Sequence, residues 1–207
     1  MNESINHTVQ NKQALYLSYF TVGYNLLEGI CSLFFGIGAG SIALVGFGLD
    51  SFVESASGVI MIWRFRGNAN LSCNDQKKKE ERALVGVGYT FLLLGGYILY
   101  ESVQKLYLKE VASPSLGGMV IAVLSLVIMP ILFFKKQKIA QQLGSKSLNA
   151  DSKQTLACSF LSLTLLLGLG FNYIWGVWWV DPVVGLLITG FLVREGVLVI
   201  RSKTVCC

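Results

Sequence analysis

Residues 42–63, IALVGFGLDSFVESASGVIMIW, decide the fold of this chain, because they combine a long apolar run with two acidic side chains. An α-helix needs roughly 20 mainly apolar residues to cross the hydrocarbon core of a bilayer. Asp50 and Glu54 lie in the middle of the run, where a charge is costly unless it faces a cavity or a partner inside a helix bundle. The run therefore predicts a membrane-spanning helix with a polar functional face.

The rest of the chain repeats this pattern of long apolar runs. Of the 207 residues, 53% are hydrophobic and 14% are charged, against about a quarter charged in an ordinary soluble domain. We predict an all-α membrane protein, a six-transmembrane-helix bundle that forms a single domain over residues 1–207 with no soluble domain. The six predicted spans are Leu15–Phe35, Ile42–Trp63, Leu84–Leu106, Leu116–Phe134, Leu156–Tyr173 and Pro182–Ile200.

The basic residues predict the orientation of these spans. If the spans alternate in direction, 15 of the 17 lysine and arginine residues fall on one side of the membrane, and only Lys105 and Lys109 fall on the other. The positive-inside rule then makes both termini cytoplasmic. The net charge of +5 is therefore a topology signal, and without interleaved basic and aromatic residues it does not indicate a nucleic-acid partner.

Asp50 and Glu54 are the strongest candidates for a cation-binding site. They are four residues apart, so both project from the same helix face. Two carboxylates this close cannot both ionise comfortably without a cation or a shared proton. Small and hydroxyl-bearing neighbours over residues 48–58 leave room for an ion or water. The alternative is that one acid is protonated and both are hydrogen-bonded to neighbouring helices.

A second pair with the same spacing, Gln154 and Cys158, lies near the cytoplasmic end of the predicted fifth span, and Asp151 precedes it by one turn. Oxygen and thiolate ligands together suit zinc or a similar borderline metal better than magnesium or calcium. The alternatives are ordinary ones. Cys158 would be a small apolar residue, and Asp151 would favour the positive end of the helix dipole.

The remaining acids inside the predicted spans have simpler expected roles. Glu28 either joins the polar interior or makes an interhelical hydrogen bond. Glu101 is expected to reach the headgroups, and Glu195 to form a surface ion pair or to interact with the helix dipole. Pro130 is expected to bend or end the fourth helix. An enzyme is not expected, because the sequence shows no nucleophile–base arrangement and its one histidine, His7, precedes the first span.

Three segments carry a resemblance to a known family. Residues Gly46–Glu54 resemble the second-helix metal motif of the cation diffusion facilitator family, in which two ligands lie four apart. Residues Trp178–Ile188 look like the opening of that family's sixth helix, and Ala150–Cys158 matches its fifth-helix motif in register. In that register, Gln154 stands where the family usually has histidine or aspartate, and Cys158 stands where it usually has aspartate.

The resemblance points to the short branch of this family, which lacks the C-terminal cytoplasmic metal-binding domain and includes vesicular zinc transporters and small bacterial cation transporters. It implies efflux of zinc or a related divalent ion, often in exchange for protons, by a homodimer in a lipid bilayer, here a bacterial cytoplasmic membrane. The ion is cargo, and no resident cofactor is expected.

The implied metal site consists of Asp50, Glu54 and Cys158, with Gln154 or Asp151 completing the shell. Because Gln154 is neutral, we predict weaker proton coupling than in members with histidine and aspartate. The alternative function is a non-transporting membrane partner or metal sensor that keeps the transporter fold.

Overall fold

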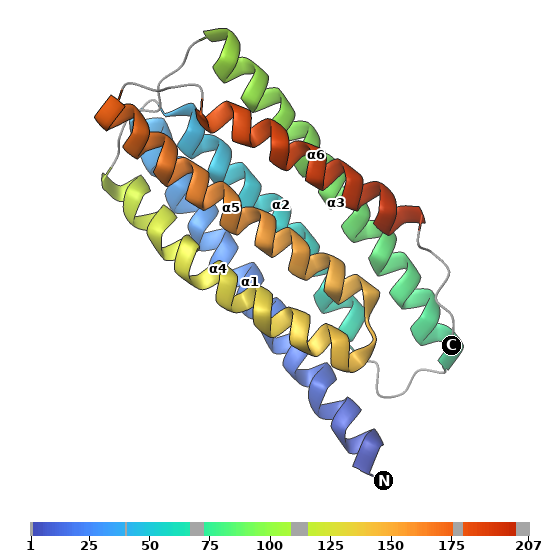
Figure 1. The fold of residues 1–207 in the computed structure, drawn as a ribbon. Helices are drawn as coiled ribbons and strands as arrows, with labels where there is room; N and C mark the ends of the chain where they lie inside the picture. Colours follow the sequence, from blue (N-terminus) through green and yellow to red (C-terminus); the bar gives the residue numbers. More distant parts are fainter. Residues whose placement is uncertain (1, 40, 67–72, 109–115, 176–179, 202–207) are drawn as a thin grey trace.

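The computed structural model describes residues 2–39, 41–66, 73–108, 116–175 and 180–201, and these form six α-helices (Figure 1). Four of the helices in these ranges are long and apolar enough to cross a membrane, which confirms the prediction of an all-α membrane protein. The helices are α1 Asn2–Ala39, α2 Ile42–Phe65, α3 Cys73–Leu108, α4 Leu116–Leu143, α5 Lys146–Trp175 and α6 Val180–Arg201.

The helices pack as three main pairs, α1 with α2, α3 with α6, and α4 with α5 (Figure 1). Helix α5 also contacts α2, α3 and α6, and α2 also contacts α3. The two helices that carry the predicted ligands are therefore central to the bundle. At one point α1 and α2 approach so closely that a Cβ on Gly48 would lie 3.0 Å from the Gly29 carbonyl oxygen. Small residues permit this close packing in lipid.

Helix α4 continues past Pro130 to Leu143, so the expectation that this proline could end the helix is wrong. A proline removes one backbone hydrogen bond, and inside a membrane bundle neighbouring groups can satisfy the freed carbonyl. Beyond Pro130, α4 still buries Leu132, Phe133, Lys136 and other side chains against the bundle. That continued burial stabilises the part of α4 that follows Pro130.

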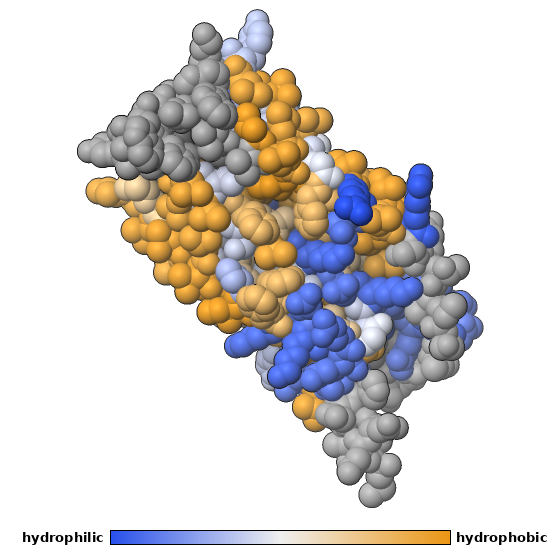
Figure 2. Space-filling view, viewed as in Figure 1, coloured by the Kyte–Doolittle hydropathy of each residue, from blue (hydrophilic) through white to orange (hydrophobic). Residues whose placement is uncertain are grey.

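The connection between α4 and α5 is a tight turn. Gly144 has a positive φ of 62°, a conformation that glycine adopts without steric cost. Ser145 then accepts a hydrogen bond from the backbone N–H of Leu148, at 3.2 Å, which caps the start of α5. Hydrophilic residues gather toward this end of the bundle, and apolar residues dominate the opposite half of the same face (Figure 2).

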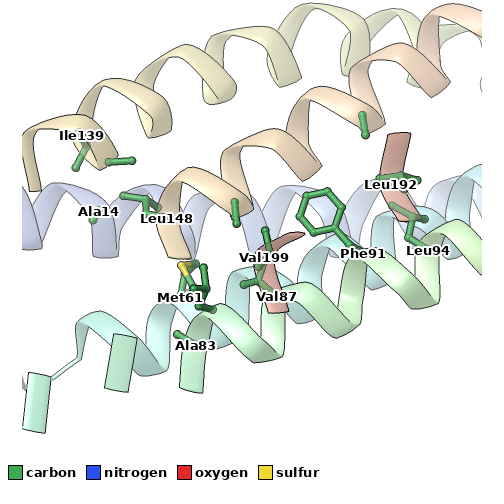
Figure 3. Close-up of a cluster of buried hydrophobic side chains, with 14 of the residues drawn as sticks. Ala14, Met61, Ala83, Val87, Phe91, Leu94, Ile139, Leu148, Leu192 and Val199 are labelled. Carbon is green, nitrogen blue, oxygen red and sulfur yellow. The ribbon is translucent and has the colours of Figure 1, made fainter. Parts of the chain in front are cut away.

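An apolar core runs along the bundle from its hydrophilic end to Ile98 and Ile188. Side chains from all six helices contribute to it, and Figure 3 shows Met61, Val87 and Leu148 packed in one cluster. Phe91 and Leu192 extend the cluster between α3 and α6, and both are fully buried.

A buried ion pair holds the same end together. Arg64 Nε of α2 donates to Glu80 Oε2 of α3 at 2.5 Å. The other oxygen of Glu80 accepts from the Ser147 backbone N–H at 2.8 Å and from the Ser145 hydroxyl at 2.9 Å, at the start of α5. One carboxylate thus joins three helices.

Replacing Glu80 with alanine should therefore destabilise the protein by about 3 kcal/mol, because it leaves Arg64 buried without its partner. Thermal unfolding in detergent measures the effect. The matched control is Glu81→Ala on the same helix, which should change stability little. Equal melting temperatures for the two variants would contradict the structural role of Glu80.

Candidate metal centre

The centre of the bundle holds two acids that have no hydrogen-bond donor. Asp50 is 1% exposed and Glu54 is fully buried, both on α2. None of their four carboxylate oxygens has a hydrogen-bond partner within the described ranges. Burying a carboxylate without a partner costs several kcal/mol. Two such carboxylates are expected to bind a cation or to share a proton.

Cys158 of α5 lies opposite these acids. Its side chain is fully buried, and it lies close enough to both Asp50 and Glu54 to interact with each of them. Two carboxylates and one thiol thus face one another across the α2–α5 contact. In the part of the chain that the structure describes, they do not yet close into a three-ligand cluster.

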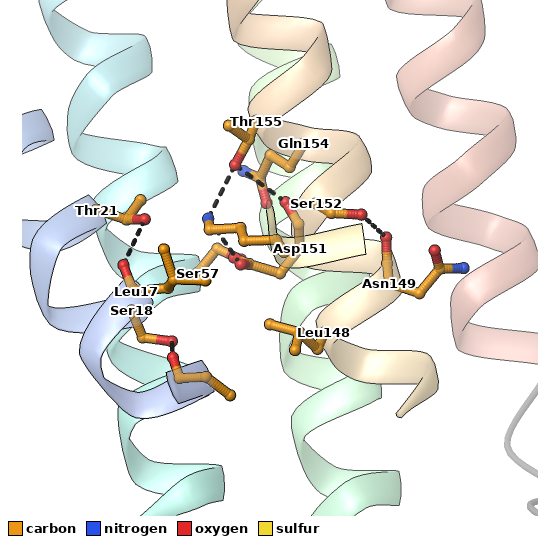
Figure 4. A network of polar contacts seen from close by, with 12 residues as sticks. Leu17, Ser18, Thr21, Ser57, Leu148, Asn149, Asp151, Ser152, Gln154 and Thr155 are labelled. Carbon is orange, nitrogen blue, oxygen red and sulfur yellow. Dashed lines mark hydrogen bonds and ion pairs between the residues drawn. The ribbon is translucent and has the colours of Figure 1, made fainter. Parts of the chain in front are cut away.

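Asp151, the third acid considered for this site, already has partners. Its Oδ1 accepts from the Ser57 hydroxyl of α2 at 2.6 Å, and its Oδ2 lies 2.9 Å from Nζ of Lys136. Lys136 also donates to the Thr155 hydroxyl at 2.9 Å. Figure 4 shows Ser57, Asp151 and Thr155 turned toward one another. Asp151 therefore forms a neutral pair with a lysine, next to the unpaired acids.

Lys136 is the residue that sequence reasoning missed. Its charge was attributed to the cytoplasmic surface along with Lys135 and Lys138, yet Lys136 is fully buried while its two neighbours are exposed. A signal was present in the sequence. Lys136 continues the face of α4 on which Ser125, Met129 and other buried residues recur at intervals of three and four.

Gln154 points from α5 toward α3. Its side-chain oxygen accepts from the Thr90 hydroxyl at 3.0 Å, and its amide nitrogen has no partner among the described residues. The amide is fully buried. Gln154 is therefore buried between α5 and α3, and its side-chain oxygen is already hydrogen-bonded to Thr90.

The other acids inside the predicted spans, Glu28, Glu101 and Glu195, each have a partner. Glu28 of α1 is buried and accepts from the Ser51 hydroxyl of α2 at 3.1 Å and from Tyr24 at 3.3 Å. It therefore makes the expected interhelical hydrogen bond and also lies in the polar interior, close to Glu54. The predicted ion pair of Glu195 is confirmed, with Lys153 of α5 as its partner at 2.7 Å.

A small cavity of about 40 Å³ leads to Asp50 from the end of the bundle where α2 and α6 begin. Its polar lining includes Glu101, whose carboxylate lies 2.9 Å from Lys105 Nζ. The expectation that Glu101 reaches the headgroups is not what the structure shows, because its side chain is only 13% exposed and faces this cavity. The space is large enough for water or a bare cation.

Comparison with known proteins shows the family to which this chain belongs. The profile of the cation efflux transmembrane domain matches residues 83–205, more than half of the chain. The chain therefore belongs to the cation efflux family, and it is a multi-pass membrane protein of a class of cation transporters, not of enzymes. This confirms the resemblance that the motifs indicated.

A particular relative extends the similarity over most of the chain. The chain is 24% identical to Transmembrane protein 163 of Xenopus laevis over 196 residues, which cover 92% of this chain and 68% of the relative. The profile match begins after α2. The assignment of Asp50 and Glu54 therefore depends on the α2 motif and on the burial described above.

Proposed function

We propose that this protein is a secondary transporter that exports a divalent transition metal, zinc first among them, through a site formed by α2 and α5. The single observation that carries the proposal is the set of four unpartnered carboxylate oxygens on Asp50 and Glu54. A divalent cation is the partner that compensates two adjacent buried carboxylates. Membership of the cation efflux family supports cation transport as the activity.

The choice of zinc follows from the donors that face the two acids. Cys158 adds a soft sulfur to two hard carboxylates, a combination that zinc accepts and that magnesium and calcium disfavour. Gln154, or Asp151 after release from Lys136, would supply a fourth ligand. A tetrahedral shell of this kind would require α5 to move toward α2.

The path to the site supports alternating access. The cavity beside Asp50 opens toward the start of α2, whereas the buried Arg64–Glu80 pair lies at the other end. Rocking of helix pairs around a fixed midplane site would open the two ends in turn. We assign the hydrophilic end to the cytoplasm, as the basic residues predict.

Several finer predictions are part of the same proposal. These are six spans with both termini cytoplasmic, a single transmembrane domain, assembly as a homodimer, and a bacterial cytoplasmic membrane. The relative described above is from Xenopus laevis. Expression in bacterial and in animal cells, followed by a comparison of membrane insertion, tests the choice of host membrane.

Zinc uptake into proteoliposomes tests the site. Asp50→Ala and Glu54→Ala should each reduce the zinc flux by at least about 100-fold, because even outer-shell changes at zinc sites cost about 10–100-fold. The matched control is Glu195→Gln, an acid with an ion-pair partner near the bundle end, which should retain most of the flux.

Unchanged flux in both alanine variants would contradict the assigned site. A wild-type protein that binds zinc without any flux would instead support the alternative of a sensor or non-transporting partner.

Proton movement tests the role of Gln154. We expect fewer protons exchanged per zinc ion than a site with an ionisable residue at this position would give, because an amide cannot release a proton when metal binds. Gln154→His should therefore raise the proton-to-zinc ratio, measured with a pH dye and a zinc dye in the same vesicles. Full proton coupling in the wild type, with no change in Gln154→His, would contradict this account.

A further inference from the structure

We propose that the groove between α1 and α4 binds an anionic phospholipid from the membrane leaflet at the hydrophilic end of the bundle. The groove is lined by residues within 9–20 of α1 and within 128–142 of α4, and its volume is about 1020 Å³. Small-molecule sites in proteins typically enclose about 300–1,000 Å³, so the groove offers enough space for part of a lipid. It shares no residue with the candidate metal centre, and the inference does not depend on the transported ion.

The lining of the groove changes from apolar to basic along its length. Phe20 of α1 and Ile131 of α4 belong to the apolar part, whereas Lys135 and Lys138 belong to the basic part, nearer the end of α4. Because an α-helix rises 1.5 Å per residue, Lys138 lies about 10 Å from Ile131 along the axis of α4. A headgroup at the lysines therefore places the acyl chains of the same lipid over the apolar lining.

The two lysines present an uncompensated positive charge. Both are exposed, and within the described ranges neither makes a hydrogen bond or an ion pair with another residue of the chain. Lys136, which lies between them in sequence, is instead buried and paired with Asp151. Lys135 and Lys138 are three residues apart, so they share one face of α4. The described lining contains no acidic residue, so the anion that complements these lysines comes from outside the chain.

The groove also lies at the right depth for a lipid. Its apolar part falls inside the predicted first and fourth spans, and Lys135 follows directly on the fourth span, which ends at Phe134. Tyr16, between the two parts, is 76% exposed, and tyrosine is typical of the boundary between hydrocarbon and headgroups. Basic pockets between membrane helices on the cytoplasmic side bind anionic headgroups. A lipid is thus the occupant that matches both parts of the groove.

Two other occupants match the groove less well. A soluble phosphate compound complements the lysines but leaves the apolar lining uncovered. A second copy of the chain, placed groove to groove about a two-fold axis, brings the same two lysines of each copy together, and like charges at close range repel. A lipid has neither disadvantage, and it would contact both helix pairs that carry the candidate metal centre, α1–α2 and α4–α5.

Native mass spectrometry of the full chain in detergent tests the proposal with dioleoyl phosphatidylglycerol and dioleoyl phosphatidylcholine, which carry the same acyl chains. We expect the anionic lipid to bind about 25-fold more tightly, because each basic residue near an anionic lipid contributes about fivefold in affinity. Lys135→Gln/Lys138→Gln should abolish this preference. The matched control is Lys78→Gln/Arg82→Gln, which removes two exposed basic residues of α3 outside the groove and should keep the preference.

A second variant separates a lipid site from a general attraction to basic surfaces. Ile131→Trp fills the apolar part of the groove and keeps both lysines, and it should weaken phosphatidylglycerol binding by at least about tenfold. Glycerol phosphate, which has no acyl chains, should not compete with the lipid. All these variants change exposed residues, and Ile131→Trp decides the question if the lysine variant does not fold.

Four results would overturn the inference. These are equal affinity for the two lipids, an equal loss of preference in the α3 control, unchanged lipid binding in Ile131→Trp, and displacement of the lipid by glycerol phosphate. A dimer that dissociates in Ile131→Trp regardless of added lipid would also overturn it, because the groove would then belong to a second copy of the chain. Zinc flux is not part of this test, so its outcome is independent of the proposed function.

Discussion

A carboxylate inside a helix bundle needs a donor or a cation, and this constraint organises the polar interior of the chain. Most of the interior acids find such a partner within the protein, either a hydroxyl group or a basic side chain. The acids with such partners are Glu28, Glu80, Glu101, Asp151 and Glu195. Asp50 and Glu54 do not, although both are completely enclosed. In the proposed function, the transported cation is the partner of these two acids.

The partnered acids also build the scaffold that keeps these two in place. Glu80 joins α2, α3 and α5 at the hydrophilic end. Ser51 donates to Glu28 and so connects α1 to α2, one residue after Asp50. The contacts of Asp151 with Ser57 and Lys136 connect α2, α4 and α5. The unpaired acids thus lie between fixed polar contacts, so any movement that gathers ligands around an ion must involve whole helices.

The two halves of the site differ in charge. Helix α2 presents two carboxylates, whereas α5 presents a thiol, a neutral amide engaged with Thr90 and an aspartate engaged with Lys136. In our proposal this asymmetry lowers the number of protons exchanged for each metal ion. The amide of Gln154 removes a group that would otherwise exchange a proton.

Sequence reasoning predicted what depends on one helix and missed what depends on helix contacts. The α2 span and the shared face of Asp50 and Glu54 follow from hydropathy and from a spacing of four. The burial of Lys136 was missed because a run of lysines normally marks the membrane boundary. The place of Glu101 beside the Asp50 cavity depends on the register between α2 and α3, which a single-helix pattern does not contain.

The central claim is that Asp50, Glu54 and Cys158 together hold a transition metal. X-ray absorption at the zinc edge, on purified protein loaded with one zinc ion per chain, tests it most directly. The account predicts a shell of oxygen or nitrogen ligands with one sulfur at about 2.3 Å, with the sulfur lost in Cys158→Ser. A zinc shell without sulfur in the wild type, or an unchanged spectrum after Asp50→Asn and Glu54→Gln, would contradict it.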